Sequence, residues 1–296
     1  MGLLEKLEKG EVGKKQQLVL EPSKGPLPQN LVPTTPPEEK IKVKIALKTG
    51  KMQLTNNERA KERPSTSVRL PRAPIGIPML DKVTEGGFIR GSVNLIGGGP
   101  GGGKSIFCMQ FLVNGIEKYG ENGVFVSFEQ SEERILQDMS RFGWKLDEKI
   151  AQGKLAIMYF TPEQIESVLQ SGSDVLRDMV EFVKGKRLII DSLNAFALLH
   201  TDESEMRKDV MKLFEVVQKW DVTTIATLEQ ESDETRHQAS VLEFETDSVT
   251  LVYNKKVNNR RMRSLEIYKM RGTKHAQKTF PMLITDKGIT IGGDAE

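Results

Sequence analysis

The chain has 296 residues, which is enough for one large domain or two small ones. Charged residues make up 28% and the formal net charge is +2, so the overall charge gives no indication of a nucleic-acid partner. The single cysteine, Cys108, excludes an internal disulfide and suits a reducing, cytoplasmic setting. No run of about 18 apolar residues occurs, so we expect no membrane span.

Residues 1–68 differ in composition from the rest and are expected to form a flexible leader. Six of the thirteen prolines fall between Pro22 and Pro37, and a second polar stretch covers residues 55–67. Such a composition cannot bury enough apolar surface to offset chain entropy. The leader is mildly basic, and it is a candidate contact for a protein partner.

One segment of this leader, residues 40–48 (KIKVKIALK), alternates apolar and basic side chains and is predicted to be a strand. We interpret it as an edge strand of the same chain, protected by its lysines. A strand donated to a neighbouring subunit and a phosphate-binding strip are the alternatives.

Residues 69–296 alternate apolar strands with helices, which predicts an α/β fold with a mostly parallel central sheet flanked by helices. The expected strands are 92–97, 124–129, 155–160, 187–193, 222–229 and 248–254. Helices are expected from the glycine loop to about residue 118, over residues 131–144 and around 203–220. The last segments, 264–272 and 278–291, are predicted to form shorter, antiparallel strands.

A phosphate-binding loop is predicted between the first strand and its helix, where the sequence GGPGGGKS matches G-x-x-x-x-G-K-[ST]. Glycines let the backbone N–H groups surround phosphates, and the helix adds the positive end of its dipole. A glycine-rich turn with a chance Lys-Ser is the alternative, but the strand before and the helix after favour nucleotide binding. The residues expected to bind the nucleotide are Gly98, Gly99, Pro100, Gly101, Gly102, Gly103, Lys104, Ser105 and Ile106. In the helix that follows, Cys108 is expected to be a buried core residue.

Two carboxylates are expected at the same edge of the sheet as Lys104. Asp191 ends an apolar strand and is predicted to hold Mg²⁺ together with Ser105, or alternatively to cap a turn. Glu129 ends the strand after the phosphate-loop helix, so it is well placed to activate a water molecule. The alternative for Glu129 is to cap the next helix, a task that Ser131 can perform itself. The strand of Glu129 is expected to lie beside the first strand or one strand away.

Four blocks together resemble the KaiC-like branch of the RecA-type ATPases, as found in many archaea: residues 76–105, 124–135, 188–196 and 269–289. The resemblance covers roughly residues 70–292 and implies a RecA-type fold with ATP bound between subunits, commonly in a hexameric ring. It also implies that Glu129 activates the attacking water. The family's K-x-R-G-[TS]-x-H block implies that Lys269, Arg271 and His275 reach the ATP of the neighbouring subunit. Without the resemblance this block would be interpreted as a solvated basic turn.

Two departures from the family's pattern affect the expected chemistry. The family often has two consecutive glutamates at the end of the second strand, whereas this chain has Glu129 followed by Gln130. We therefore predict that Glu129 is the sole base. The clock proteins' second ATPase domain carries phosphorylatable Ser-Thr where this chain has Glu243 and Phe244, so no autokinase activity is expected at that position.

The leading interpretation is a Mg²⁺-dependent ATPase that acts as a homo-oligomer. A nucleotide-gated scaffold with little turnover is one alternative. A recombinase-like ATPase that binds DNA through loops 229–238 and 254–263 is another, and it is not favoured. The second loop carries five cations, but a solvated hairpin turn at residues 257–259 is the simpler interpretation. Those cations are Lys255, Lys256, Arg260, Arg261 and Arg263. The fold class does not identify the cellular process.

Overall fold

The computed structural model describes residues 70–161, 164, 174–197, 199–200, 202–230 and 240–292. The predicted leader and its strand at residues 40–48 lie outside these residues, as does most of the loop at 229–238. No helix in the described part is long and apolar enough to cross a membrane.

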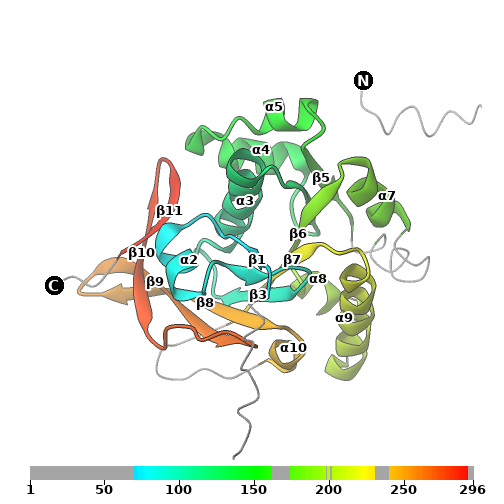
Figure 1. Ribbon diagram of the computed structural model, residues 1–296. Coiled ribbons are helices and arrows are strands. Elements are labelled where there is room, and N and C mark those ends of the chain that lie inside the picture. The colour runs from blue at the N-terminus through cyan, green and yellow to red at the C-terminus, as the bar shows by residue number, and fades with distance from the viewer. Residues whose placement is uncertain are drawn as a thin grey trace, which may run out of the picture. The chain divides into compact units, whose positions relative to one another are not determined.

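A sheet of nine strands forms the centre of the described region, in the order β11-β10-β9-β8-β3-β7-β6-β4-β5 (Figure 1). The neighbours from β8 to β5 pair in parallel, and β8 to β11 pair as antiparallel neighbours. The predicted parallel core and antiparallel end are thus confirmed. The strands are β3 (Val93–Gly98), β4 (Asn122–Ser127), β5 (Leu155–Tyr159), β6 (Gly185–Asp191), β7 (Thr223–Glu229), β8 (Ser248–Val257), β9 (Arg260–Met270), β10 (Thr279–Thr285) and β11 (Gly288–Ile291).

Two details of the predicted sheet are wrong. Strand β4 does not lie beside β3 or one strand away, because both β7 and β6 stand between them. These two strands come later in the chain and insert into the middle of the sheet, which local sequence patterns do not reveal. The first antiparallel strand is also not short, since β9 has 11 residues and is paired on both sides, whereas β11 is short, with four residues.

Helices cover both faces of the sheet. One face carries α3 (Lys104–Asn114), the π-helical turn η1 (Gly115–Tyr119), α4 (Glu132–Met139), η2 (Ser140–Phe142) and α5 (Leu146–Ala151). The other carries α7 (Asp174–Phe182), α8 (Asn194–Ala197), α9 (Glu203–Gln218) and α10 (Val241–Phe244) (Figure 1). Before β3 come β1 (Arg72–Ala73), α2 (Pro78–Val83) and β2 (Phe88–Ile89), and β1 pairs with β2 in a separate two-stranded sheet.

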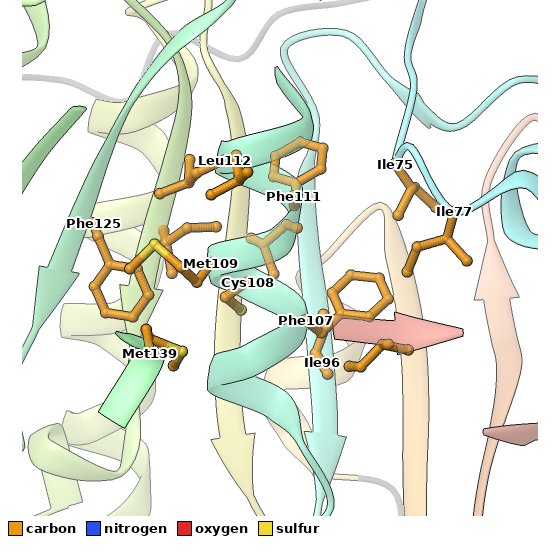
Figure 2. Packing of buried hydrophobic residues seen from close by; sticks show 14 of the residues in the cluster. Ile75, Ile77, Ile96, Phe107, Cys108, Met109, Phe111, Leu112, Phe125 and Met139 are labelled. Atoms are coloured by element: carbon orange, nitrogen blue, oxygen red, sulfur yellow. The ribbon is translucent and has the colours of Figure 1, made fainter. Parts of the chain in front are cut away.

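Helix α3 is fixed by an apolar core. Figure 2 shows its side chains packed toward Ile96 of β3, Phe125 of β4 and Met139 of α4. Cys108 is fully buried in this core, as the sequence predicts. Each large apolar side chain buried in this way contributes roughly 1.5–3 kcal/mol. The buried apolar side chains of α3 that take part are Phe107, Cys108, Met109, Phe111, Leu112 and Val113.

The far end of α3 is held by a buried arginine. Arg187 of β6 is fully buried, donates through Nη1 to the carbonyl of Phe111 at 2.7 Å, and pairs with Glu121 at 2.6 Å. Because α3 is fixed at this end and along its apolar side, its first residues are held rigidly at the end of β3.

Candidate functional site

The loop between β3 and α3 has the backbone that a phosphate-binding loop requires. Gly98 has φ of 150° and passes so close to β8 that a Cβ there would lie 2.2 Å from the carbonyl oxygen of Val252. Gly103 precedes α3 in the left-handed conformation, with φ of 100° and no side-chain cap, and the first turn of the helix carries no acidic residue. The start of α3 therefore suits an anion, because helix N-termini present N–H groups and a positive dipole end.

Lys104 lies in this loop with its ammonium group half-buried. Its Nζ donates to the carbonyls of Gly98 at 2.8 Å and Gly99 at 3.1 Å. Burial lowers the pKa of Lys104, while the nearby charges of Glu229, Asp191 and Glu129 act in the opposite direction. The amine and these carboxylates thus meet at the carboxyl edge of the sheet, as predicted for Lys104, Asp191 and Glu129.

The residues predicted to hold Mg²⁺ lie near each other. The Asp191 carboxyl accepts a hydrogen bond from the Thr227 hydroxyl, and the Ser105 side chain acts to lower the pKa of the same carboxyl. A hydroxyl and a carboxylate are the hard oxygen donors that Mg²⁺ prefers, so these residues fit the ion. In the part of the chain that the structure describes, no group of three or more His, Cys, Asp or Glu residues could hold a metal on its own. The remaining ligands would therefore be phosphate oxygens and water.

Replacement of Asp191 by asparagine is expected to stabilise the nucleotide-free protein and to weaken Mg²⁺ binding in the presence of ATP by at least about tenfold. Burial raises the pKa of the Asp191 carboxyl, and a carboxyl with a raised pKa costs stability once pH rises through that pKa. Thermal unfolding at neutral pH and Mg²⁺ titration would measure both effects. The matched control is Asp286→Asn, in the exposed turn between β10 and β11. A lower unfolding temperature for Asp191→Asn would contradict the first expectation.

Glu129 lies two residues beyond the end of β4, so the predicted strand end is two residues too long. Its carboxylate accepts a hydrogen bond from the Ser192 hydroxyl, which is buried next to Asp191. The cap of α4 is supplied by Ser131, whose side chain accepts from the N–H of Arg134 at 3.4 Å. A capping role therefore does not account for Glu129, and its role as the base stays a prediction.

Gln130 points away from the predicted metal ligands. Its backbone N–H donates to the Ser127 hydroxyl at 2.9 Å, and its side-chain amide donates to Asp138 of α4 at 3.3 Å. A glutamate at this position would face the carboxylate of Asp138, so the neutral side chain suits its surroundings in this chain.

Glu229 is a site residue that the sequence interpretation missed. It ends β7, and its charge has the largest raising effect on the pKa of Lys104. Asn194 fixes its backbone, donating to the Glu229 carbonyl at 2.9 Å and accepting from its N–H at 2.6 Å. The signal was present in the sequence, since β7 is an apolar strand ending on an acid, like the strands before Glu129 and Asp191.

Lys269 and Arg271 lie at the other end of the sheet. Lys269 opposes Val249 on β8, and the Arg271 N–H bonds to Asp247, whose own N–H bonds to Val93 at the start of β3. Along β3, roughly 16 Å of strand separate the level of Arg271 from the phosphate loop, and roughly 10 Å separate the level of Lys269, because Val249 pairs with Leu95. The structure therefore does not bring these cations to the chain's own phosphate loop.

Both cations bind the C-terminal end of α10. Lys269 donates to the carbonyls of Glu243 at 2.8 Å and Thr246 at 2.7 Å, and Arg271 donates to that of Phe244 at 2.8 Å.

Two further predicted site residues have local contacts. The Nδ1 of His275 lies 3.2 Å from the carbonyl oxygen of Ala276. Ile106, the last residue of the predicted nucleotide run, is partly buried against the core of α3.

The basic segment 254–263 forms the hairpin between β8 and β9, as the simpler interpretation predicts. Asn258 and Asn259 form its turn, with φ of 47° and 61°. Positive φ at both central residues belongs to the two-residue turns that suit the twist of a hairpin. Arg263, which the sequence interpretation grouped with candidate DNA contacts, instead donates to the carbonyl of Gly101 at 2.9 Å.

Comparison with known proteins places these observations in a family. Residues 73–296 match the family model described as "ATPase: KaiC". The circadian clock oscillator protein KaiC of Parathermosynechococcus lividus is 35% identical over 231 residues, which cover 75% of this chain and 42% of that protein. The protein of the same name from Synechococcus elongatus is 33% identical over 218 residues, covering 71% of this chain and 42% of that protein. The chain thus spans less than half the length of these curated relatives.

A solved structure extends the similarity to the fold. The crystal structure of a KaiC-like protein from the hyperthermophilic archaeon Pyrococcus horikoshii OT3 matches with a TM-score of 0.68 and 33% sequence identity. The match covers 76% of this chain and 100% of that chain. The predicted RecA-type fold is thereby confirmed.

Proposed function

The chain belongs to the KaiC family of ATPases, and from this premise we propose that it hydrolyses ATP with Mg²⁺ as a homo-oligomer. The observation that carries the proposal is the meeting of Lys104, Ser105, Asp191 and Glu129 at one edge of the sheet, beside the start of α3. A phosphate loop, a Mg²⁺ ligand pair and a carboxylate for the attacking water are the parts that phosphoryl transfer to water needs.

Each residue has a role that follows from its place. The backbone N–H groups of the loop glycines (residues 98, 99 and 101–103) and the start of α3 bind the phosphates. Lys104 leaves the carbonyls of Gly98 and Gly99 and moves to the outer phosphates, because charged oxygens are stronger acceptors. Ser105 and Asp191 hold Mg²⁺, which would offset the negative charge of the phosphates.

Glu129 accepts a proton from the attacking water. The Ser192 hydroxyl holds one of its carboxylate oxygens, and this contact fixes the direction from which the carboxylate approaches. Charge then develops on the transferred phosphoryl group, and cations beyond Lys104 are needed to stabilise it.

Those further cations come from a second copy of the chain. Lys269 and Arg271 lie too far along the sheet to serve the chain's own phosphates, which supports a site shared between subunits. An interface that joins the phosphate edge of one subunit to the opposite end of the next is head-to-tail, and head-to-tail contacts form a ring when the rotation between subunits closes. We propose a hexamer, following the family resemblance.

Phosphate release and native mass, each measured with and without ATP and Mg²⁺, test the proposal together. We expect Mg²⁺-dependent turnover and an ATP-dependent increase of mass to that of a hexamer. A protein that turned over ATP fully as a monomer would contradict the shared site. ATP-dependent assembly without turnover would instead support a nucleotide-gated scaffold.

A further inference from the structure

Four consecutive carbonyls of the phosphate loop accept hydrogen bonds from side chains or backbone groups. The Gly98 carbonyl accepts from Lys104 at 2.8 Å and from the N–H of Gln230 at 3.3 Å, and the Gly99 carbonyl accepts from Lys104 at 3.1 Å. The two carbonyls at the tip are bound by side chains of the β8–β9 hairpin. Asn254 Nδ2 donates to Pro100 at 3.4 Å, and Arg263 Nε donates to Gly101 at 2.9 Å.

The two hairpin donors act from one rigid position. Asn254 on β8 and Arg263 on β9 are cross-strand partners, so their side chains lie on the same face of the ribbon. Arg263 also opposes Met282 of β10, so its strand is paired on both sides. These donors are therefore fixed by the sheet and do not depend on the loop for their position.

Asn254 fits closely against the loop and retains an unused acceptor. Gly101 has φ of 70°, and a Cβ there would lie 3.0 Å from Asn254 Nδ2. Within the described part of the chain, Asn254 Oδ1 is buried without a hydrogen-bond partner. If the Asn254 amide were turned over, its oxygen would face the Pro100 carbonyl oxygen and repel it. The hydrogen bond to Pro100 therefore fixes the orientation of the Asn254 amide. A buried acceptor without a partner costs about 1–3 kcal/mol, and the fold tolerates it to hold Pro100.

We propose that Asn254 and Arg263 are positioning residues of the nucleotide site. By binding the carbonyls of Pro100 and Gly101, they fix the two peptide planes at the tip of the loop before the nucleotide arrives. The N–H of Gly101 lies opposite the Pro100 carbonyl in its peptide plane and is left to face a phosphate. The N–H of Gly102 donates to the Gly99 carbonyl at 3.4 Å in the nucleotide-free loop, and it becomes available once a phosphate oxygen competes for it. The inference rests on the proposed function, since it assumes that this loop binds nucleotide phosphates. Glycine-rich backbone is otherwise free to adopt many conformations, and ordering it would reduce the affinity.

Loss of either donor frees a peptide plane to turn. A carbonyl that faces a phosphate replaces an attraction with a repulsion, so nucleotide affinity falls. Full-length Arg263→Ala is expected to bind ADP without Mg²⁺ about tenfold more weakly, which corresponds to about 1.4 kcal/mol. Asn254→Ala is expected to weaken ADP binding by a similar factor, and Arg263→Lys to restore part of the loss. Isothermal titration calorimetry measures these affinities.

Two controls separate positioning from simple charge attraction and from misfolding. Arg260→Ala removes the same charge from the exposed tip of the hairpin and is expected to leave ADP affinity unchanged. The loss in Arg263→Ala should persist in about 0.5 M salt, where attraction between exposed charges is screened. Thermal unfolding of the nucleotide-free Arg263 variants should match that of the unaltered chain, because the strand pairing of β8 and β9 remains, and that of Asn254→Ala should not be lower.

The possible outcomes distinguish this inference from the proposed function. Unchanged ADP affinity in Arg263→Ala and Asn254→Ala would overturn the positioning role. A loss confined to Arg263→Ala that disappears in salt would overturn it as well, because charge alone would then explain it. If the unaltered chain bound ADP but did not hydrolyse ATP, only the proposed hydrolysis would fail. If it bound no ADP at all, both would fail.

Discussion

Replacement of Glu129 by glutamine is expected to lower the steady-state rate of ATP hydrolysis by about 10²–10⁴-fold, the usual contribution of a general base. Glutamine has the same shape and keeps an oxygen that can accept from the Ser192 hydroxyl, so the geometry of the site is retained. Only the ability to accept a proton is lost. ATP affinity should therefore stay within about twofold, since the contacts to the phosphates are unchanged. Phosphate release and nucleotide titration on the same preparation measure the two quantities.

Three further variants make this result specific. Glu133→Gln, an exposed glutamate in the first turn of α4, is the matched control and should hydrolyse ATP normally. Gln130→Glu should change the rate without being required for it; if hydrolysis needed this substitution, the chain would be a switch and not an enzyme. Full activity in Glu129→Gln would exclude it as the base. Glu229 would then be the next candidate, because its charge also acts on Lys104, and Glu229→Gln would test it.

Much of the fold could be predicted from the sequence because its signals are local. Apolar strands, the glycine loop and the helix that follows it each appear as a continuous pattern, and the mostly parallel sheet with an antiparallel end followed from their alternation. The order of the strands within the sheet could not be predicted from that alternation. The pairing of β3 with β7 joins Val93–Gly98 to Thr223–Glu229, and contacts between segments so far apart leave no periodic trace in a single sequence.

The residues of the candidate site likewise fall into those with a local sequence signal and those without one. Lys104, Asp191 and Glu129 could be placed together because each follows an apolar strand and parallel strands end at one edge. Glu229 has the same signal and was overlooked. Asn254 and Arg263 carry no such signal, because they act from the middle of a ribbon on backbone carbonyls. In the sequence, Asn254 and Arg263 cannot be distinguished from other polar residues of a solvated hairpin. Their contacts with the phosphate loop become visible only in the three-dimensional structure.

Replacement of Arg271 by alanine is expected to lower ATP hydrolysis by about 10³-fold, which is the lower range for an arginine that stabilises transferred phosphoryl charge. In the single chain, Arg271 binds the carbonyl of Phe244 and lies 3.9 Å from Asp247, so the substitution also removes contacts to α10. A loss of rate alone would therefore not distinguish a shared site from a loosened helix. Lys274→Ala, a neighbouring exposed lysine, is the control for lost positive charge and should retain normal activity.

Co-assembly of two inactive variants makes that distinction. Glu129→Gln subunits retain Arg271, and Arg271→Ala subunits retain Glu129. If the site lies between subunits, an interface that combines Glu129 of one variant with Arg271 of the other is complete. With random mixing in equal amounts, about one quarter of the interfaces in a head-to-tail ring have this composition, so about a quarter of the normal rate should return. A loosened α10 or a site within one chain gives no recovery, because every subunit then carries its own defect. Co-expressed mixed oligomers that remained as inactive as either variant alone would contradict the shared site.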